Sequence, residues 1–186
     1  MSYLRRKNIL RKTIIVITAD HGEALAENRV VGHGHSLNTV IQVPLIVYLP
    51  WNDQKHRISN IVELIDVAPS ILKQLNIKIP KSFKGINIFN INDSIDKEFG
   101  FSQIGKWVMI RDKNYIFKEK AKYFSLYDLI RDPFEFTNII EDNNERTENF
   151  MVAYRSFINN RSELKVESRE IDHETIMQLK SLGYIK

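Results

Sequence analysis

The stretch TIIVITADHGEALAENRVVGHGHSL (Thr13–Leu37) passes from an uninterrupted apolar run into a loop rich in acidic and histidine side chains. Its first six residues, TIIVIT (Thr13–Thr18), are apolar or β-branched, which is typical of a strand buried on both faces of a parallel sheet. A second run of this kind, VPLIVYLP (Val43–Pro50), contains prolines only near its two ends, as strands require. Two such strands with a mixed segment between them predict an α/β layer.

The loop that follows the first predicted strand is the first candidate site. Asp20, His21 and Glu23 lie just past the carboxyl end of that strand, where open α/β sheets place their ligand sites. Asp is a hard anionic ligand and His a neutral nitrogen ligand, so the adjacent pair suits a divalent cation. Asp-His-Gly is a short motif, however, and Asp20 would equally serve as the cap of a following helix. Because the chain has no cysteine, any metal site must use oxygen or imidazole ligands.

The second candidate is His33, which stands between Gly32 and Gly34. The glycines let the backbone approach a ligand closely, and the imidazole could donate to an anionic oxygen or protonate a leaving group. The alternative is a loop histidine that only hydrogen-bonds locally. His35 has no role that the residues define, and Ser36 is as good a helix cap as a nucleophile. No group completes a Ser-His-Asp triad.

Composition bounds the remaining function classes. The chain has 186 residues, of which 43% are hydrophobic, enough for one substantial domain with a core. Its net charge of +4 comes from Lys and Arg scattered among 23 acids, so we expect no nucleic-acid partner. No apolar run is long enough to span a membrane. The basic N-terminus, MSYLRRKNILRK, lacks the apolar core of an export signal. As written the sequence would therefore be cytoplasmic, and its localisation stays unknown.

The rest of the chain predicts one helix, then antiparallel strands, and then two further helices. Apolar residues at helical spacing predict a helix within Ile61–Leu75, with Pro69 in a first turn and Asp66 ahead of it as a cap. WVMIRD, NYIFKEK and FSLYDL are short strand candidates between residues 103 and 129, and antiparallel hairpins fit them best. Further helices are predicted at 144–160 and 172–182, the last closed by Gly183.

The change near residue 95 from an α/β pattern to short antiparallel strands and helices predicts two structural parts. Residues 1–95 would form part of an α/β core, and residues 96–186 a small subdomain of antiparallel sheet and helices.

Four stretches taken in order resemble the sulfatase family of the alkaline-phosphatase-like superfamily. They are TADHGEALAENRVVGHGHSLNTVIQVPLIVYLP, IVELIDVAPSILKQLNIKIPKSFKGINIF, FSLYDLIRDPFEFTNII and LKSLGYI. The resemblance covers nearly the whole chain. It implies an alkaline-phosphatase-like α/β fold, present as a partial, mostly parallel sheet with a C-terminal α+β subdomain that carries a small antiparallel sheet.

The resemblance also implies an activity and its residues. Asp20 and His21 match the second pair of ligands to a divalent cation, usually Ca²⁺, with Mn²⁺ or Mg²⁺ as alternatives, and His21 stands where many members have Asn. His33 stands where many sulfatases have a lysine that contacts the sulfate and its bridging oxygen. The implied reaction is metal-dependent hydrolysis of a sulfuric ester, either a small molecule or a sulfated glycan.

The largest departure from the family is an absence. The family's nucleophile, a Cys or Ser in a Cys/Ser-x-Pro-x-Arg motif that becomes formylglycine, does not occur in these 186 residues. The upstream pair of metal-binding aspartates is missing too. We therefore expect the C-terminal portion of a sulfatase, inactive alone, with an unprotected apolar face on the strand Thr13–Thr18 and an N-terminal half as a potential partner chain. Full-length relatives are often exported.

Two alternatives stay open at this point. One is a phosphoryl or phosphonate ester hydrolase or transferase of the same superfamily, which His33 in place of lysine permits. The other is a non-catalytic remnant or binding module that keeps the fold and has lost the reaction.

Overall fold

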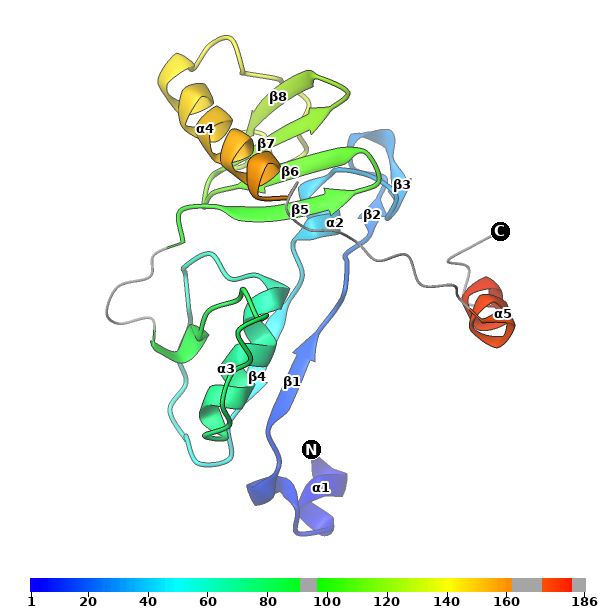
Figure 1. Cartoon of the computed structure of the whole chain (residues 1–186), viewed down its shortest axis with the longest axis vertical. Coiled ribbons are helices and arrows are strands. Elements are labelled where there is room, and N and C mark those ends of the chain that lie inside the picture. The colour runs from blue at the N-terminus through cyan, green and yellow to red at the C-terminus, as the bar shows by residue number, and fades with distance from the viewer. Residues whose placement is uncertain (91–96, 162–171, 182–186) are drawn as a thin grey trace. The chain divides into compact units, whose positions relative to one another are not determined.

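The computed structural model of the chain describes residues 1–90, 97–161 and 172–181 (Figure 1). They fall into two compact units, Met1–Ala153 and Tyr154–Lys186, whose border lies inside helix α4 (Asn144–Arg161). The border near residue 95 that the sequence suggests stays a prediction. In the described part of the chain, no helix combines the length and apolar character that crossing a membrane requires.

The first two predicted strands form, and they pair with each other. Two short helices, α1 (Ser2–Arg6) and η1 (Leu10–Lys12), precede strand β1 (Ile15–Thr18), which pairs with β4 (Leu45–Tyr48). The pairing is antiparallel, although the apolar composition of both strands is typical of a parallel sheet. A parallel crossover needs a long connection, usually a full helix that runs back along the sheet. Here the connection holds only short elements, so the chain re-enters at the end where it left.

The β1–β4 pair is also less buried than its composition predicts. Ile17 and Ile46 lie directly opposite each other in the register, and each is more than half exposed. In the described residues these two strands form a sheet of their own. The expected unprotected apolar face on this strand is therefore present.

The segment between β1 and β4 carries the candidate site. It consists of a small hairpin, a 3-10 turn and one short helix, namely β2 (Ala24–Leu25), η2 (Glu27–Arg29), β3 (Val31–Gly32) and α2 (Asn38–Ile41). Three buried side chains, Ala24, Leu37 and Val40, anchor it and pack against Val30 and Ile104. Ile104 belongs to the C-terminal sheet, so this small core fixes the hairpin to a larger element.

The predicted helix after β4 begins later than its apolar pattern suggests. A 3-10 turn, η3 (Leu64–Asp66), leads into α3 (Val67–Gln74), and another, η4 (Ile88–Asn90), follows. The Asp66 carboxylate is fully buried and accepts the backbone N–H groups of Glu63 and Ile86 at 2.9 and 2.8 Å. Asp66 thus occupies the predicted cap position, although its side chain serves neighbouring loops rather than α3.

One lysine neutralises this buried carboxylate. Lys97 Nζ lies 2.7 Å from Asp66 Oδ2 and 2.8 Å from Glu63 Oε2. Burial alone would lower the pKa of Lys97, but the hydrogen bonds to the two carboxylates outweigh burial and raise it. The group joins the start of α3 to the chain that enters the C-terminal sheet.

That sheet has four antiparallel strands in sequence order, which confirms the predicted hairpins. The strands are β5 (Gly100–Ile104), β6 (Trp107–Arg111), β7 (Tyr115–Lys120) and β8 (Tyr123–Asp128). Strand β5 was not predicted, because its residues GFSQI include Gly, Ser and Gln and give little strand signal.

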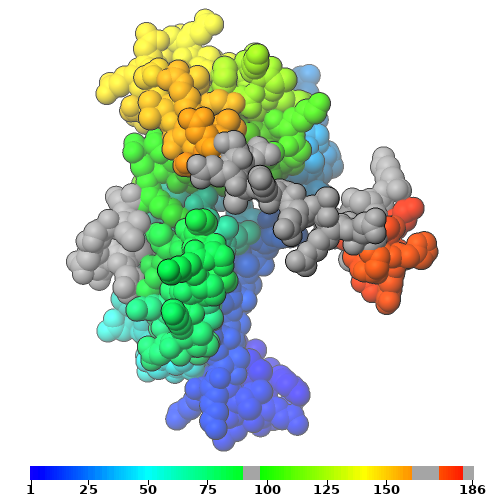
Figure 2. All heavy atoms as spheres, in the orientation of Figure 1, coloured from blue at the N-terminus to red at the C-terminus, as the bar shows by residue number. Residues whose placement is uncertain are grey.

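The two faces of the sheet have different partners. Phe117 on β7 stacks with Phe150 on α4 at a ring distance of 5.9 Å, so the part of α4 that belongs to the first unit covers one face (Figure 1 and Figure 2). Because side chains alternate along a strand, Lys118 points to the other face. There it is buried and pairs with the buried carboxylate of Glu135.

Glu135 connects this second face to the site segment. Its Oε1 accepts the backbone N–H of Asn38 at the start of α2 at 2.6 Å, and its backbone carbonyl accepts Asn28 Nδ2 at 3.2 Å. Burial lowers the pKa of Lys118, and the charge of Glu135 opposes that shift. A single carboxylate therefore satisfies a buried ammonium and a helix-start donor together.

The second unit contains the end of α4 and helix α5 (His173–Ser181). Asp172 caps α5, since its carboxylate accepts both the N–H and the hydroxyl of Thr175 at 2.8 Å. These bonds lower the pKa of Asp172. Both C-terminal helices are thus confirmed, and the predicted cap Gly183 lies outside the described residues.

We expect Glu135→Gln to lower the free energy of unfolding by about 3–5 kcal/mol, because it leaves Lys118 buried without a counter-charge. The amide keeps an oxygen for the Asn38 N–H, so the loss reports the charge. Urea denaturation of the full chain measures it, with exposed Glu141→Gln as the matched control. Equal stabilities of the two variants, within about 0.5 kcal/mol, would contradict the role assigned to the pair.

Candidate functional site

The site begins where β1 ends, two residues beyond Thr18. The carboxylate of Asp20 accepts the backbone N–H of His21 at 3.0 Å, and Nδ1 of His21 lies 2.8 Å from the carbonyl oxygen of Gly22. A carbonyl only accepts, so we assign the proton to Nδ1, which leaves Nε2 with a free lone pair. Nε2 lies 3.8 Å from Oδ1 of Asp20, so these two potential metal-ligand atoms lie side by side.

Gly22 holds this pair against α2. Its N–H donates to the carbonyl of Val40 at 2.7 Å, and a Cβ atom built on Gly22 would lie 2.0 Å from the carbonyl oxygen of Thr39. Any side chain at this position would collide with backbone. The glycine is therefore required for close approach, and it fixes the position of His21 relative to a helix that Glu135 anchors.

The hairpin register brings His33 to the same place. Ala24 pairs with Gly32 in the β2–β3 ladder, so Glu23 and His33 are the next residues to face each other. Nδ1 of His33 lies 3.1 Å from Oε2 of Glu23. Gly32 has φ +101°, a backbone conformation that other residues rarely adopt, and it stands directly before His33.

The rings of His21 and His33 stack, with centroids 4.3 Å apart and planes at 23°. His21, Glu23 and His33 form a cluster whose potential ligand atoms all lie within 4.8 Å of one another. The side chains of Asp20, His21, Glu23 and His33 are 73%, 37%, 47% and 59% exposed, respectively, so all of them are open to a ligand.

The structure thus brings together the three residues singled out in the sequence, Asp20, His21 and His33. It adds Glu23. The sequence shows that Glu23 lies close to Asp20 and His21, but not that its carboxylate pairs with His33. His35 is exposed, and Ser36 is buried beside the small core of the hairpin. Neither belongs to the cluster.

The geometry of Asp20 and His21 fits a shared cation. Calcium–oxygen ligand distances are about 2.3–2.6 Å, so two ligands of one ion can lie up to about 5 Å apart. The observed 3.8 Å falls within that limit. Two donors are well short of the six to eight that calcium takes, so the remaining ligands must come from water or from residues elsewhere.

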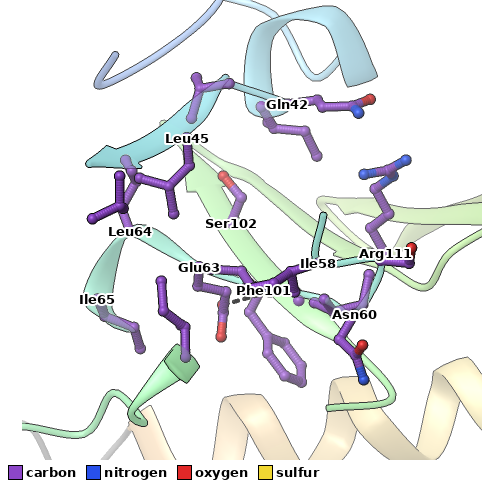
Figure 3. Close-up of a pocket in the computed structure, with 18 of the residues that line it drawn as sticks. Gln42, Leu45, Ile58, Asn60, Glu63, Leu64, Ile65, Phe101, Ser102 and Arg111 are labelled. Atoms are coloured by element: carbon purple, nitrogen blue, oxygen red, sulfur yellow. Dashed lines mark hydrogen bonds between the residues drawn. The ribbon is translucent and has the colours of Figure 1, made fainter. Parts of the chain in front are cut away.

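Asp20 and His21 also border a large hollow of about 1090 Å³. Its walls mix polar and apolar side chains and come from β4, the loop before α3 and strand β5 (Figure 3). Leu45 and Leu64 form part of one wall, and Arg111 and Asn60 lie across from them. Burial lowers the pKa of Arg111 against the opposing charges of Asp112 and Glu135. The cationic side chain of Arg111 therefore lines the same cavity as Asp20 and His21.

Comparisons with known proteins indicate which family the chain resembles. The sulfatase family model matches residues 1–77. Arylsulfatase K of Bos taurus is 27% identical over 176 residues, covering 84% of this chain and 33% of the relative. The chain therefore spans about a third of the length of the curated relatives it matches.

Solved structures share the fold. The phosphonate monoester hydrolase of Silicibacter pomeroyi superposes with a TM-score of 0.73 at 21% identity, covering 93% of this chain and 40% of the other. A structure in complex with its substrate D-glucosamine-2-N,6-O-disulfate gives a TM-score of 0.72 at 18% identity, covering 91% and 38%. These likenesses confirm the predicted alkaline-phosphatase-like α/β fold. Taken with the family match over residues 1–77, the segment that carries Asp20, His21 and His33, they support the sulfatase family, and the chain is similar to the C-terminal part of the full enzyme.

Proposed function

We propose that the chain is part of a metal-dependent sulfuric ester hydrolase, to which it contributes Asp20, His21 and His33. The observation that carries the proposal is the convergence of these three side chains at the end of β1. The donor atoms of Asp20 and His21 lie 3.8 Å apart, and the ring of His33 stacks on that of His21 at 4.3 Å. Ligand and proton-transfer groups are thus adjacent in a chain that is similar to sulfatases.

Each residue has a distinct task in this proposal. A bound divalent cation would polarise the sulfuryl oxygens. Asp20 would hold the cation with a carboxylate oxygen and His21 with Nε2, the nitrogen left free by the bond to Gly22. Glu23 would accept the Nδ1–H of His33 and orient its ring, so that the doubly protonated imidazolium could donate its Nε2–H to the ester or leaving oxygen.

The nucleophile must come from residues outside this sequence. The 186 residues contain no cysteine and no Ser-x-Pro-x-Arg segment, and the chain spans about a third of its relatives. We propose that the formylglycine nucleophile and the other cation ligands lie in the N-terminal part of a longer protein. The comparisons offer no support for a separate N-terminal chain.

The substrate class we propose is a sulfate ester, carried on a small molecule or on a sulfated glycan. Support comes from the arylsulfatase relatives and from the structural neighbour that binds a disulfated glucosamine. The hollow beside Asp20 and His21, with Arg111 on its wall, offers space and a positive charge for such a group.

A phosphonate monoester hydrolase is the second candidate. Two enzymes of that class, from Silicibacter pomeroyi and Agrobacterium radiobacter, superpose with TM-scores of 0.73 and 0.72. Phosphonate and sulfate monoesters are both tetrahedral anions, so the geometry of Asp20, His21 and His33 serves either. The upstream sequence separates the two, because a Cys/Ser-x-Pro-x-Arg motif favours the sulfatase and a lone Thr nucleophile favours phosphoryl transfer.

We expect weak Ca²⁺ binding to the chain, with a dissociation constant of about 10⁻³ M, since only part of the ligand shell is present. Asp20→Asn should weaken binding at least about tenfold, because it removes the anionic ligand. Isothermal titration calorimetry measures both, and His33→Ala serves as the control that leaves Ca²⁺ affinity unchanged. Calcium binding that is unaffected by Asp20→Asn would favour the non-catalytic remnant.

We expect the purified 186-residue chain to turn over neither p-nitrophenyl sulfate nor p-nitrophenyl phenylphosphonate at a measurable rate, with Ca²⁺, Mn²⁺ or Mg²⁺ supplied. The reason is that half of the cation site without a nucleophile leaves nothing to attack the ester. Release of p-nitrophenol is the readout. Metal-dependent turnover that His33→Ala abolishes would overturn the proposal that the nucleophile and the other cation ligands lie outside these 186 residues.

A further inference from the structure

The cluster of His21, Glu23 and His33 has a donor set unlike that of a calcium site. It offers two imidazoles and one carboxylate within 4.8 Å of one another, so nitrogen outnumbers oxygen in it, whereas calcium prefers oxygen ligands. Imidazole nitrogen suits zinc, copper and nickel, and two His with one carboxylate is a common three-ligand set for zinc. The cluster therefore favours a different class of ion from the Asp20–His21 pair.

The backbone holds these side chains close to the required geometry. The β2–β3 register places Glu23 opposite His33, and the contact of Gly22 with α2 fixes His21 beside them. Around a tetrahedral zinc with bonds near 2.0 Å, ligand atoms lie about 3.3 Å apart. Nδ1 of His33 and Oε2 of Glu23 are already 3.1 Å apart, so closure requires mainly a rotation of exposed imidazoles, at small cost.

We propose that His21, Glu23 and His33 form a site for a late first-row transition-metal ion such as Zn²⁺. The site needs no residue from outside this chain, since three protein ligands with water in the fourth position suffice. It shares His21 with the proposed calcium pair. One Nε2 lone pair cannot bind two ions, so occupation by Zn²⁺ would exclude calcium from His21 and withdraw His33 from substrate.

The competition with calcium at His21 and the withdrawal of His33 from substrate rest on the proposed function. The binding itself depends on three side chains, and their ligand roles differ from that of Asp20. A variant of Glu23 should therefore weaken binding of the transition metal and leave calcium binding unchanged.

The test is titration of the untagged, full 186-residue chain with Co²⁺, followed by displacement with Zn²⁺. Four-coordinate Co²⁺ gives visible absorption bands, and calorimetry with Zn²⁺ gives the affinity directly. We expect one ion per chain, and we expect Glu23→Gln and His33→Ala each to weaken Zn²⁺ binding at least about tenfold. His35→Ala is the matched control on the same loop, and it should stay within about twofold of the parent chain.

Absence of Zn²⁺ binding to the parent chain would overturn the proposal. So would binding that survives both Glu23→Gln and His33→Ala, or binding that His35→Ala removes, because the ion would then occupy a different site. Failure of this proposal is distinguishable from failure of the proposed function, since calcium binding is predicted to depend on Asp20 and to be indifferent to Glu23 and His33.

Discussion

The buried ion pair between Lys118 and Glu135 is the interaction on which the site segment depends. Both side chains are almost fully buried, and charges in such a setting are tolerated only when they are paired and hydrogen-bonded. Glu135 meets this requirement by also accepting the N–H of Asn38 at the start of α2. The carboxylate that neutralises the sheet lysine is therefore the same group that positions the helix behind the candidate site.

The geometry of the site follows from that anchor through a short chain of contacts. Helix α2 presents its backbone to Gly22, which can have no side chain at that distance. Gly22 sets the position of His21, and the hairpin core around Ala24 sets the register that brings His33 opposite Glu23. The candidate side chains themselves are between 37% and 73% exposed. Their arrangement is fixed almost entirely by backbone elements, which leaves the side chains free to bind a ligand.

Patterns local in the sequence were predictable, and pairings between distant segments were not. The apolar runs around β1 and β4, the hairpins of β6 to β8 and the two C-terminal helices all have periodicity or turn signals that a single sequence carries. The antiparallel pairing of β1 with β4 depends on the shape of the connection, which residue composition does not encode. Strand β5 could not be predicted because its residues have low strand propensity, and its pairing with β6 stabilises it.

The candidate site shows the same division. Asp20, His21 and His33 were found because their residue types stand next to a predicted strand and because the ordered motifs resemble one family. The pairing of Glu23 with His33 needs the register of a hairpin with only two residues in each strand, which no apolar alternation could reveal. The Lys118–Glu135 pair was equally hidden, since a lysine within a strand usually faces solvent.

The central claim is that the loop from Asp20 to His33 is a cation-binding half-site. Titration of the ¹⁵N-labelled chain with substoichiometric Mn²⁺, followed by ¹H–¹⁵N correlation spectra, tests it most directly. A paramagnetic ion held there should broaden the amide signals of residues 20–23 and 32–34 first, while signals from β7 and β8 stay sharp. Broadening that starts on another surface, or no selective broadening at any Mn²⁺ concentration, would contradict the claim.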